Sequence, residues 1–148
     1  MTSRLEELYK QMILEHNKNP RHFHALDPHT HHVHGVNPLC GDDYQLYLKV
    51  ENGVIEDIGF EGQGCAISKS SGSILSTTLK GLPTEDALEI KTAFIEMLTK
   101  DKPISEKLGR LKVFEGVKKY PIRVKCATLI WRALESALET DSIAVSTE

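Results

Sequence analysis

Three cysteines, Cys40, Cys65 and Cys126, are the residues of this sequence best suited to chemistry, and none belongs to a C-x-x-C pair. Cys40 lies in the turn-rich stretch NPLCGDD, in which Asp42 follows closely. Three thiolates and one carboxylate form a four-ligand set that suits tetrahedral zinc. Thiolate-rich sets also bind copper(I) and iron–sulfur clusters in preference to magnesium or calcium.

Each of these residues also has a purely structural explanation. Free cysteines are often buried and act as small hydrophobic residues, and an aspartate next to glycine is a common turn residue. The long intervals between the three cysteines contain no compact ligand pair of the kind that marks most zinc sites. Composition and position alone therefore leave metal ligands and ordinary buried thiols both open.

The histidines form a second set of candidate ligands. All seven lie in the first quarter of the chain, and the segment 22–34, which contains HTHHVHG, holds most of them. Such tracts bind metals adventitiously, but this one shows no fixed ligand geometry. We expect a mainly solvated, variable segment, and the alternative that one histidine joins the cysteine site stays open.

The hydrophobic pattern predicts an α+β fold, in which a small antiparallel sheet of about three strands has helices packed on one face. Residues 46–50 and 54–61 alternate as half-buried strands do, and Asn52-Gly53 between them is typical of a type I′ hairpin turn. Residues 20–43 should be largely loop, with a short edge strand near 30–36.

Helices are expected on both sides of this hairpin. Apolar spacing predicts a first helix over residues 4–17, with Leu5, Leu8, Met12 and Ile13 on one face. Further helices are predicted over 66–80, closed by Gly81, over 84–100 with Thr84 as N-cap, near 108–117, and over RVKCATLIWRALESALE. Cys65 and Cys126 should lie in or beside first helical turns, where the helix dipole stabilises a thiolate. Trp131 should lie in the core, and the polar tail from about residue 140 should be frayed.

The composition fits a single domain spanning residues 1–148. Hydrophobic residues make up 40% of the 148 residues, too many for a disordered chain. The net charge of −3 argues against nucleic-acid binding, which requires a concentrated basic surface. No run approaches the roughly 20 apolar residues of a membrane helix, and the N-terminus lacks the pattern of a signal peptide. We therefore expect a cytoplasmic protein with no membrane partner.

Three stretches together resemble the NifU/IscU-like proteins of iron–sulfur cluster assembly: LYKQMILEHNKNPRH, NPLCGDDYQLYLKVENGVIEDIGFEGQGCAISKSSGS and YPIRVKCATLIWRALESAL. The likeness runs from about Leu5 to Leu138 and is greatest to the SufU branch. IscU-type scaffolds have a histidine directly before the third cysteine, where this sequence has Lys125. The long segment between Cys65 and Cys126, with its extra region Thr84 to Pro103, is likewise similar to SufU.

The resemblance implies a zinc site formed by Cys40, Asp42, Cys65 and Cys126, and a function as a zinc-dependent sulfurtransferase. The implied partner is a SufS-like, pyridoxal-phosphate-dependent cysteine desulfurase, which donates persulfide sulfur for delivery to a downstream iron–sulfur assembly scaffold. Because all four ligands come from the protein, one thiolate must leave the metal in order to react. Cys40 is the expected acceptor, since it lies in a Pro/Gly loop.

Two other functions remain compatible with the sequence. The same residues could assemble a [2Fe–2S] cluster on a scaffold, although Lys125 in place of histidine disfavours it. The chain could also be a zinc-stabilised interaction domain without transfer chemistry. Arg123 and Lys125 either stabilise the anionic persulfide or are ordinary solvated residues at a helix start.

Overall fold

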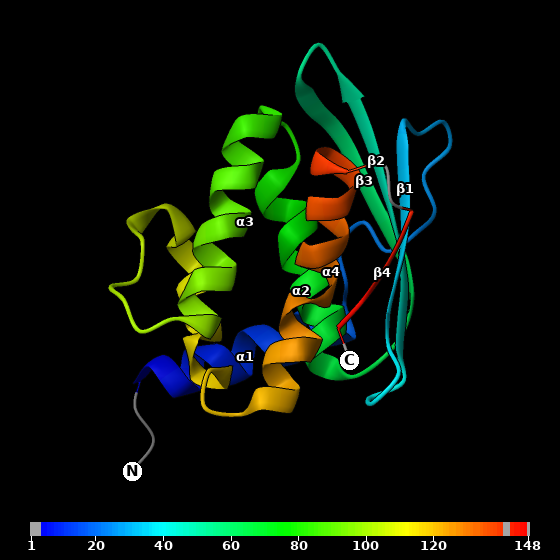
Figure 1. Ribbon diagram of the computed structural model, residues 1–148. Helices are drawn as coiled ribbons and strands as arrows, with labels where there is room; N and C mark the ends of the chain where they lie inside the picture. The colour runs from blue at the N-terminus through cyan, green and yellow to red at the C-terminus, as the bar shows by residue number, and fades with distance from the viewer. Residues whose placement is uncertain (1–3, 141–142, 148) are drawn as a thin grey trace.

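Helices cover one face of a β-sheet in the computed structural model, which describes residues 4–140 and 143–147 (Figure 1). This arrangement confirms the predicted α+β class with helices on one face. The elements in chain order are α1 (Arg4–Lys18), β1 (His31–Asn37), β2 (Asp42–Glu51), β3 (Val54–Gln63), α2 (Ala66–Leu79), α3 (Thr84–Thr99), the 3₁₀ helix η1 (Glu106–Val117), α4 (Pro121–Glu139) and β4 (Ala144–Ser146).

The sheet has four strands in the order β3-β2-β1-β4, one more than the sequence predicted. The β2–β3 hairpin is confirmed, and both Asn52 and Gly53 have the positive φ angles, 52° and 74°, that a type I′ turn requires. The additional strand β4 runs parallel to β1, so the sheet is mixed and β1 is an inner strand rather than an edge. The prediction of a frayed tail was wrong for this strand, which continues into a hydrogen bond from the Thr147 amide to the Val36 carbonyl (3.1 Å).

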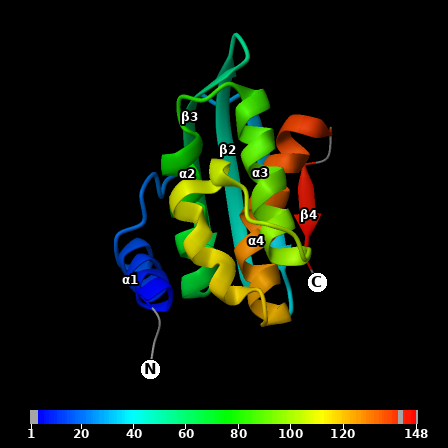
Figure 2. The same cartoon turned by 90° about the vertical axis from the view of Figure 1, so that its left-hand side faces the viewer.

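Two layers of helix lie on the sheet. Helices α2 and α4 contact the strands, while α3 and η1 pack outside them (Figure 2). Trp131 of α4 is fully buried, as predicted, and stacks on Phe94 of α3 with 4.6 Å between ring centroids. Its indole N–H donates to the Ser71 hydroxyl of α2 (3.0 Å), so one side chain joins three helices.

Two details of the helix starts differ from the prediction. The N-cap of α3 is Pro83 and not Thr84, because Thr84 is already the first residue of the helix. The Thr84 amide, which has no acceptor inside the helix, donates to the Gly53 carbonyl (2.9 Å). Helix α4 begins at Pro121, whose fixed φ suits the first helical position. Cys126 therefore lies in the second turn and not the first, which weakens the expected effect of the helix dipole on its thiol.

The N-terminal histidines are more structured than a solvated segment. Residues 31–37 form β1, in which Val33 is buried. His16 of α1 is buried, and its Nδ1 lies 2.7 Å from the Ser73 hydroxyl of α2. Burial, with help from the nearby Arg21 and Arg110 guanidiniums, lowers the pKa of His16 to about 4. Leu8, predicted on the buried face of this helix, is exposed instead.

No helix in the described ranges is both long enough and apolar enough to cross a bilayer.

Candidate metal centre

Cys40 is presented by a tight turn between β1 and β2. The Cys40 amide donates to the Asn37 carbonyl (3.2 Å), which closes the turn, and Gly41 follows with a φ of 73°. The Asn37 side chain supports the turn twice: its Oδ1 accepts from the Leu39 amide (3.2 Å), and its Nδ2 donates to the Cys40 sulfur (3.5 Å). The thiol thus lies on a short, hydrogen-bonded loop.

Asp42 is the first residue of β2 and is 1% exposed. Its Oδ1 accepts the backbone N–H of Cys65 (3.0 Å), and its Oδ2 lies 3.9 Å from the Cys65 sulfur. Asp43, next in the strand, points to the opposite face, as strand alternation requires. Its Oδ1 lies 2.6 Å from Nε2 of His34.

Cys65 is the N-cap of α2, so its position at a helix start is as predicted. Its sulfur accepts the backbone N–H of Ser68 (3.4 Å) and lies 3.5 Å from the hydroxyl of that residue. The neighbouring Cys126 side chain, reinforced by Ser68 and opposed by burial, lowers the pKa of the Cys65 thiol to about 6. The neighbouring Cys65 side chain and burial raise the pKa of the Cys126 thiol.

The structure brings three of the four predicted site residues into one cluster and places the fourth, Cys65, beside it. Ligand atoms of Cys40, Asp42 and Cys126 lie within 4.8 Å of one another, and the sulfurs of Cys126 and Cys40 are 3.3 Å apart. Cys65 lies next to this cluster, with its sulfur 3.9 Å from Asp42 Oδ2. The donors come from a turn, a strand start, a helix start and the second turn of α4.

Three sulfur donors and one carboxylate oxygen, held by well-formed elements, are a donor set that fits zinc. Asp42 and Cys126 are buried, while Cys40 and Cys65 are half-buried. The site is therefore closed towards the core and reachable from the side of the Cys40 turn.

Several supporting residues were not identified from the sequence. Ser68 holds the Cys65 sulfur, and Asn37 holds Cys40. A Cβ on Gly64 would lie 2.5 Å from Asp42 Oδ1 and 2.7 Å from the hydroxyls of Ser68 and Tyr44. Only glycine therefore lets the chain pass beside the site. The position of Ser68, three residues after the N-cap, could have indicated its contact with the Cys65 sulfur. Nothing in the sequence indicated the crowding around Gly64.

Arg123 and Lys125 lie in two different hollows. Arg123 is exposed, its guanidinium stacks over the Tyr120 ring at 4.5 Å, and it lines a hollow of about 720 Å³ with Tyr9. Lys125 is half-buried and lines a hollow of about 760 Å³ with Arg132, between α3, α4 and β4. The structure thus separates two residues that the sequence had grouped.

Comparison with known proteins points to one family. Residues 8–127 match the model of the NifU-like N terminal domain. The chain is 41% identical over 135 residues to the zinc-dependent sulfurtransferase SufU of Bacillus subtilis, an alignment that covers 90% of this chain and 91% of the relative. It is 38% identical to the iron–sulfur cluster assembly scaffold protein IscU of Streptococcus pyogenes, covering 93% and 86% of the two chains.

Solved structures agree with the sequence matches. A crystal structure of a SufU from Fervidobacterium islandicum, named as a scaffold protein for the SUF system, superposes with a TM-score of 0.83 and 32% identity. It covers 90% of this chain and 98% of that one. A NifU-like protein from Brucella abortus gives a TM-score of 0.80 at 25% identity, over 92% and 95% of the chains. This chain therefore belongs to the SufU-type branch of the NifU/IscU-like family of iron–sulfur cluster assembly proteins.

Proposed function

We propose that this protein is a zinc-dependent sulfurtransferase, which accepts persulfide sulfur from a cysteine desulfurase and passes it to a downstream assembly scaffold. The observation that carries the proposal is the convergence of Cys40, Asp42, Cys65 and Cys126 from four separate parts of the fold. These four residues are the proposed zinc ligands. The name of the Bacillus subtilis relative, a zinc-dependent sulfurtransferase, supports the proposed activity.

Cys40 is the proposed sulfur acceptor because its surroundings constrain it least. Cys65 is fixed as an N-cap, and Cys126 is buried within α4. Cys40 lies in the turn and is half-buried, beside Leu39, which is 68% exposed. A partner's persulfide can therefore approach Cys40 with the smallest rearrangement of the fold.

The transfer is a thiol–persulfide exchange, and it balances without an external oxidant or reductant. The Cys40 thiolate attacks the outer sulfur of the donor persulfide and forms a new S–S bond. The donor's own S–S bond breaks, and its cysteine leaves as a thiolate, so the protein now carries the persulfide. Bound zinc supplies the positive charge that keeps the thiolate ligands deprotonated at neutral pH.

A [2Fe–2S] scaffold is the second candidate, since relatives at 38% and 35% identity are named as IscU scaffold proteins. Thiolates bind both kinds of centre. Metal content and visible absorbance of untagged protein, purified without oxygen, separate the two candidates. We expect about one zinc per chain and no visible bands, whereas iron, sulfide and charge-transfer bands would replace the proposal with the scaffold.

The proposed acceptor is tested by incubating the zinc-loaded protein with a cysteine desulfurase and cysteine, and then locating the added sulfur by mass spectrometry. We expect the extra sulfur on Cys40, and none on a Cys40→Ala variant. Leu39→Ala, in the same turn but without a thiol, is the matched control and should accept sulfur. A Cys40→Ala protein that accepts sulfur at the wild-type level would contradict the assignment.

A further inference from the structure

Three histidines line one hollow on the outer face of the sheet, away from the helices. His32 and His34 alternate with the inward-facing Val33 and Gly35 of β1, so both point outwards. With His29 they line a hollow of about 540 Å³, together with Thr30, Gln45 and Ile143. The sulfur transfer proposed above makes no use of this cluster.

Each of the three imidazoles is held by one ring nitrogen against an oxygen that can only accept. His29 Nδ1 donates to the Leu26 carbonyl (2.7 Å), and His34 Nε2 donates to the Asp43 carboxylate (2.6 Å). His32 Nε2 donates to the Gln45 side-chain oxygen. In a neutral imidazole the other nitrogen then carries the lone pair. This is the arrangement of metal-binding histidines, whose second N–H is typically bound by a carboxylate or carbonyl.

Tyr47 of β2 restrains two of these rings further. The Tyr47 ring stacks on His32 with 4.4 Å between centroids and an interplanar angle of 12°, and it meets His29 edge-on at 5.2 Å. The centroids of His29 and His32 are themselves 5.6 Å apart. The hydrogen bonds therefore set which nitrogen of each ring is free, and packing keeps His29 and His32 beside Tyr47.

We infer that His29, His32 and His34 form a binding site for a divalent transition-metal ion, distinct from the cysteine site. Imidazole donors suit zinc, nickel and copper(II), and they do not suit magnesium or calcium. In the described part of the chain, only Cys40, Asp42 and Cys126 have three ligand atoms already within 4.8 Å. The free histidine nitrogens lie further apart than this, so we expect small rotations of the three side chains, within their hydrogen bonds, to bring them onto the ion. Side-chain motions of this kind take picoseconds to nanoseconds.

The two sites lie on opposite faces of the same strands. Asp42 faces the cysteines, and its neighbour Asp43 orients His34. Each site can thus be filled or removed while the other is left intact. A test of the histidines therefore does not depend on whether the cysteine site transfers sulfur.

The test uses the full-length, untagged protein loaded with zinc, to which nickel(II) is added. Calorimetry measures the nickel stoichiometry and affinity, a colorimetric chelator measures any zinc released, and NMR records which histidine signals the paramagnetic ion broadens. The test variant is the double substitution His32→Gln/His34→Gln. The matched control is His31→Gln, on the same strand, whose Nδ1 contacts Thr30 and which lies outside the hollow.

We expect one nickel ion per chain, broadened signals from His29, His32 and His34, and no release of zinc. The double variant should bind nickel at least about tenfold more weakly, while His31→Gln should match the wild type. Wild-type affinity in the double variant, broadening confined to other histidines, or no nickel binding would each overturn the inference. Failure of sulfur acceptance, by contrast, would concern the cysteine site alone.

Discussion

Asp42 has two tasks at the scale of the single residue. One carboxylate oxygen accepts the backbone N–H of Cys65 and so fixes the start of α2, while the other faces the Cys65 sulfur. An amide in its place keeps the first contact through its own oxygen but loses the charge. The structural and metal-binding contributions of this residue can therefore be separated by one conservative change.

We predict that Asp42→Asn, which changes a proposed ligand itself, lowers zinc affinity by at least about tenfold and leaves the fold intact. Competition with a chromophoric chelator measures the affinity, and circular dichroism checks the fold. Asp43→Asn is the matched control, since Asp43 lies on the other face of the strand and should leave the cysteine site at wild-type affinity. Equal zinc affinity in the two variants would remove Asp42 from the ligand set.

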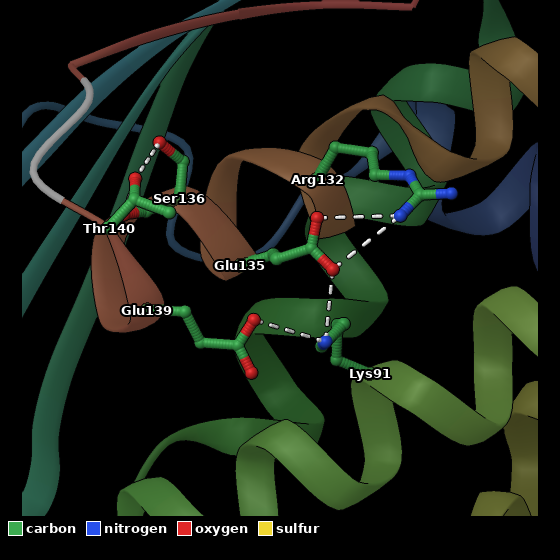
Figure 3. Close-up of polar contacts among 6 residues, drawn as sticks. All are labelled: Lys91, Arg132, Glu135, Ser136, Glu139 and Thr140. Carbon is green, nitrogen blue, oxygen red and sulfur yellow. Dashed lines mark hydrogen bonds and ion pairs between the residues drawn. The ribbon is translucent and has the colours of Figure 1, made fainter.

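At the scale of secondary-structure elements, an ion-pair network joins α3 to α4. Lys91 of α3 is 5% exposed, and its Nζ lies 3.1 Å from Glu135 and 3.6 Å from Glu139 (Figure 3). Arg132 also contacts Glu135, at 3.4 Å. The two glutamates are partly exposed, so solvent weakens the pairing on their side.

We predict that Lys91→Ala destabilises the protein by about 1–3 kcal/mol, because it leaves two neighbouring carboxylates without their shared, buried partner. Lys100→Ala is the matched control. Lys100, the C-cap residue of α3, is exposed and pairs with Glu96 of that helix, so its loss should cost about 0.5 kcal/mol or less. Urea unfolding of both variants measures the difference, and equal costs would contradict a structural role for the network.

At the scale of the whole molecule, the proposed metal ligands join parts that are distant in sequence. Cys40 lies just before the β2–β3 hairpin, and Asp42 is its first residue. Cys65 and Cys126 belong to the two helices that lie against the sheet. An ion bound by all four residues binds the folded state only, and so adds its binding free energy to stability.

We therefore predict that removing zinc lowers the melting temperature. Zinc at 1,000 times its dissociation constant contributes about 4 kcal/mol, which corresponds to roughly 10 °C for a chain of this size. Thermal unfolding with and without a chelator measures the shift. A Cys126→Ser variant, which keeps only three of the ligands, should show a clearly smaller shift than the wild type. An unchanged wild-type melting temperature would contradict the four-ligand site.

The sequence predicted where helices and strands lie along the chain better than it predicted which of them pack or pair together. Alternation in β2 and β3 and the Asn52-Gly53 turn indicated the hairpin directly, because these signals are local. The pairing of β4 with β1 could not be predicted, since three residues carry too little pattern to indicate a strand. The grouping of the cysteines came from the family resemblance, and their actual approach required the tertiary fold.

The supporting residues show the same limit. Ser68 acts through a local capping contact and was within reach of sequence reasoning. Gly64 matters because Asp42, Ser68 and Tyr44 surround it, and only the folded chain brings those side chains together. The histidine pattern predicts a solvated tract because nothing in the sequence indicates that β1 is an inner strand with these residues on one face.

The turn between β1 and β2 has one consequence for how this protein can change over time. Leu46 and Leu48 hold the register of β2 in the core, so Asp42 is fixed in place. Loss or gain of one residue between Asn37 and Asp42 would have to be absorbed at Cys40, which would shift by about 3.3 Å. Metal–ligand distances tolerate about 0.2 Å. The number of residues in this turn is therefore constrained more tightly than their identity. The exposed Leu39 can be replaced during evolution, whereas an insertion or deletion in the turn cannot be accommodated.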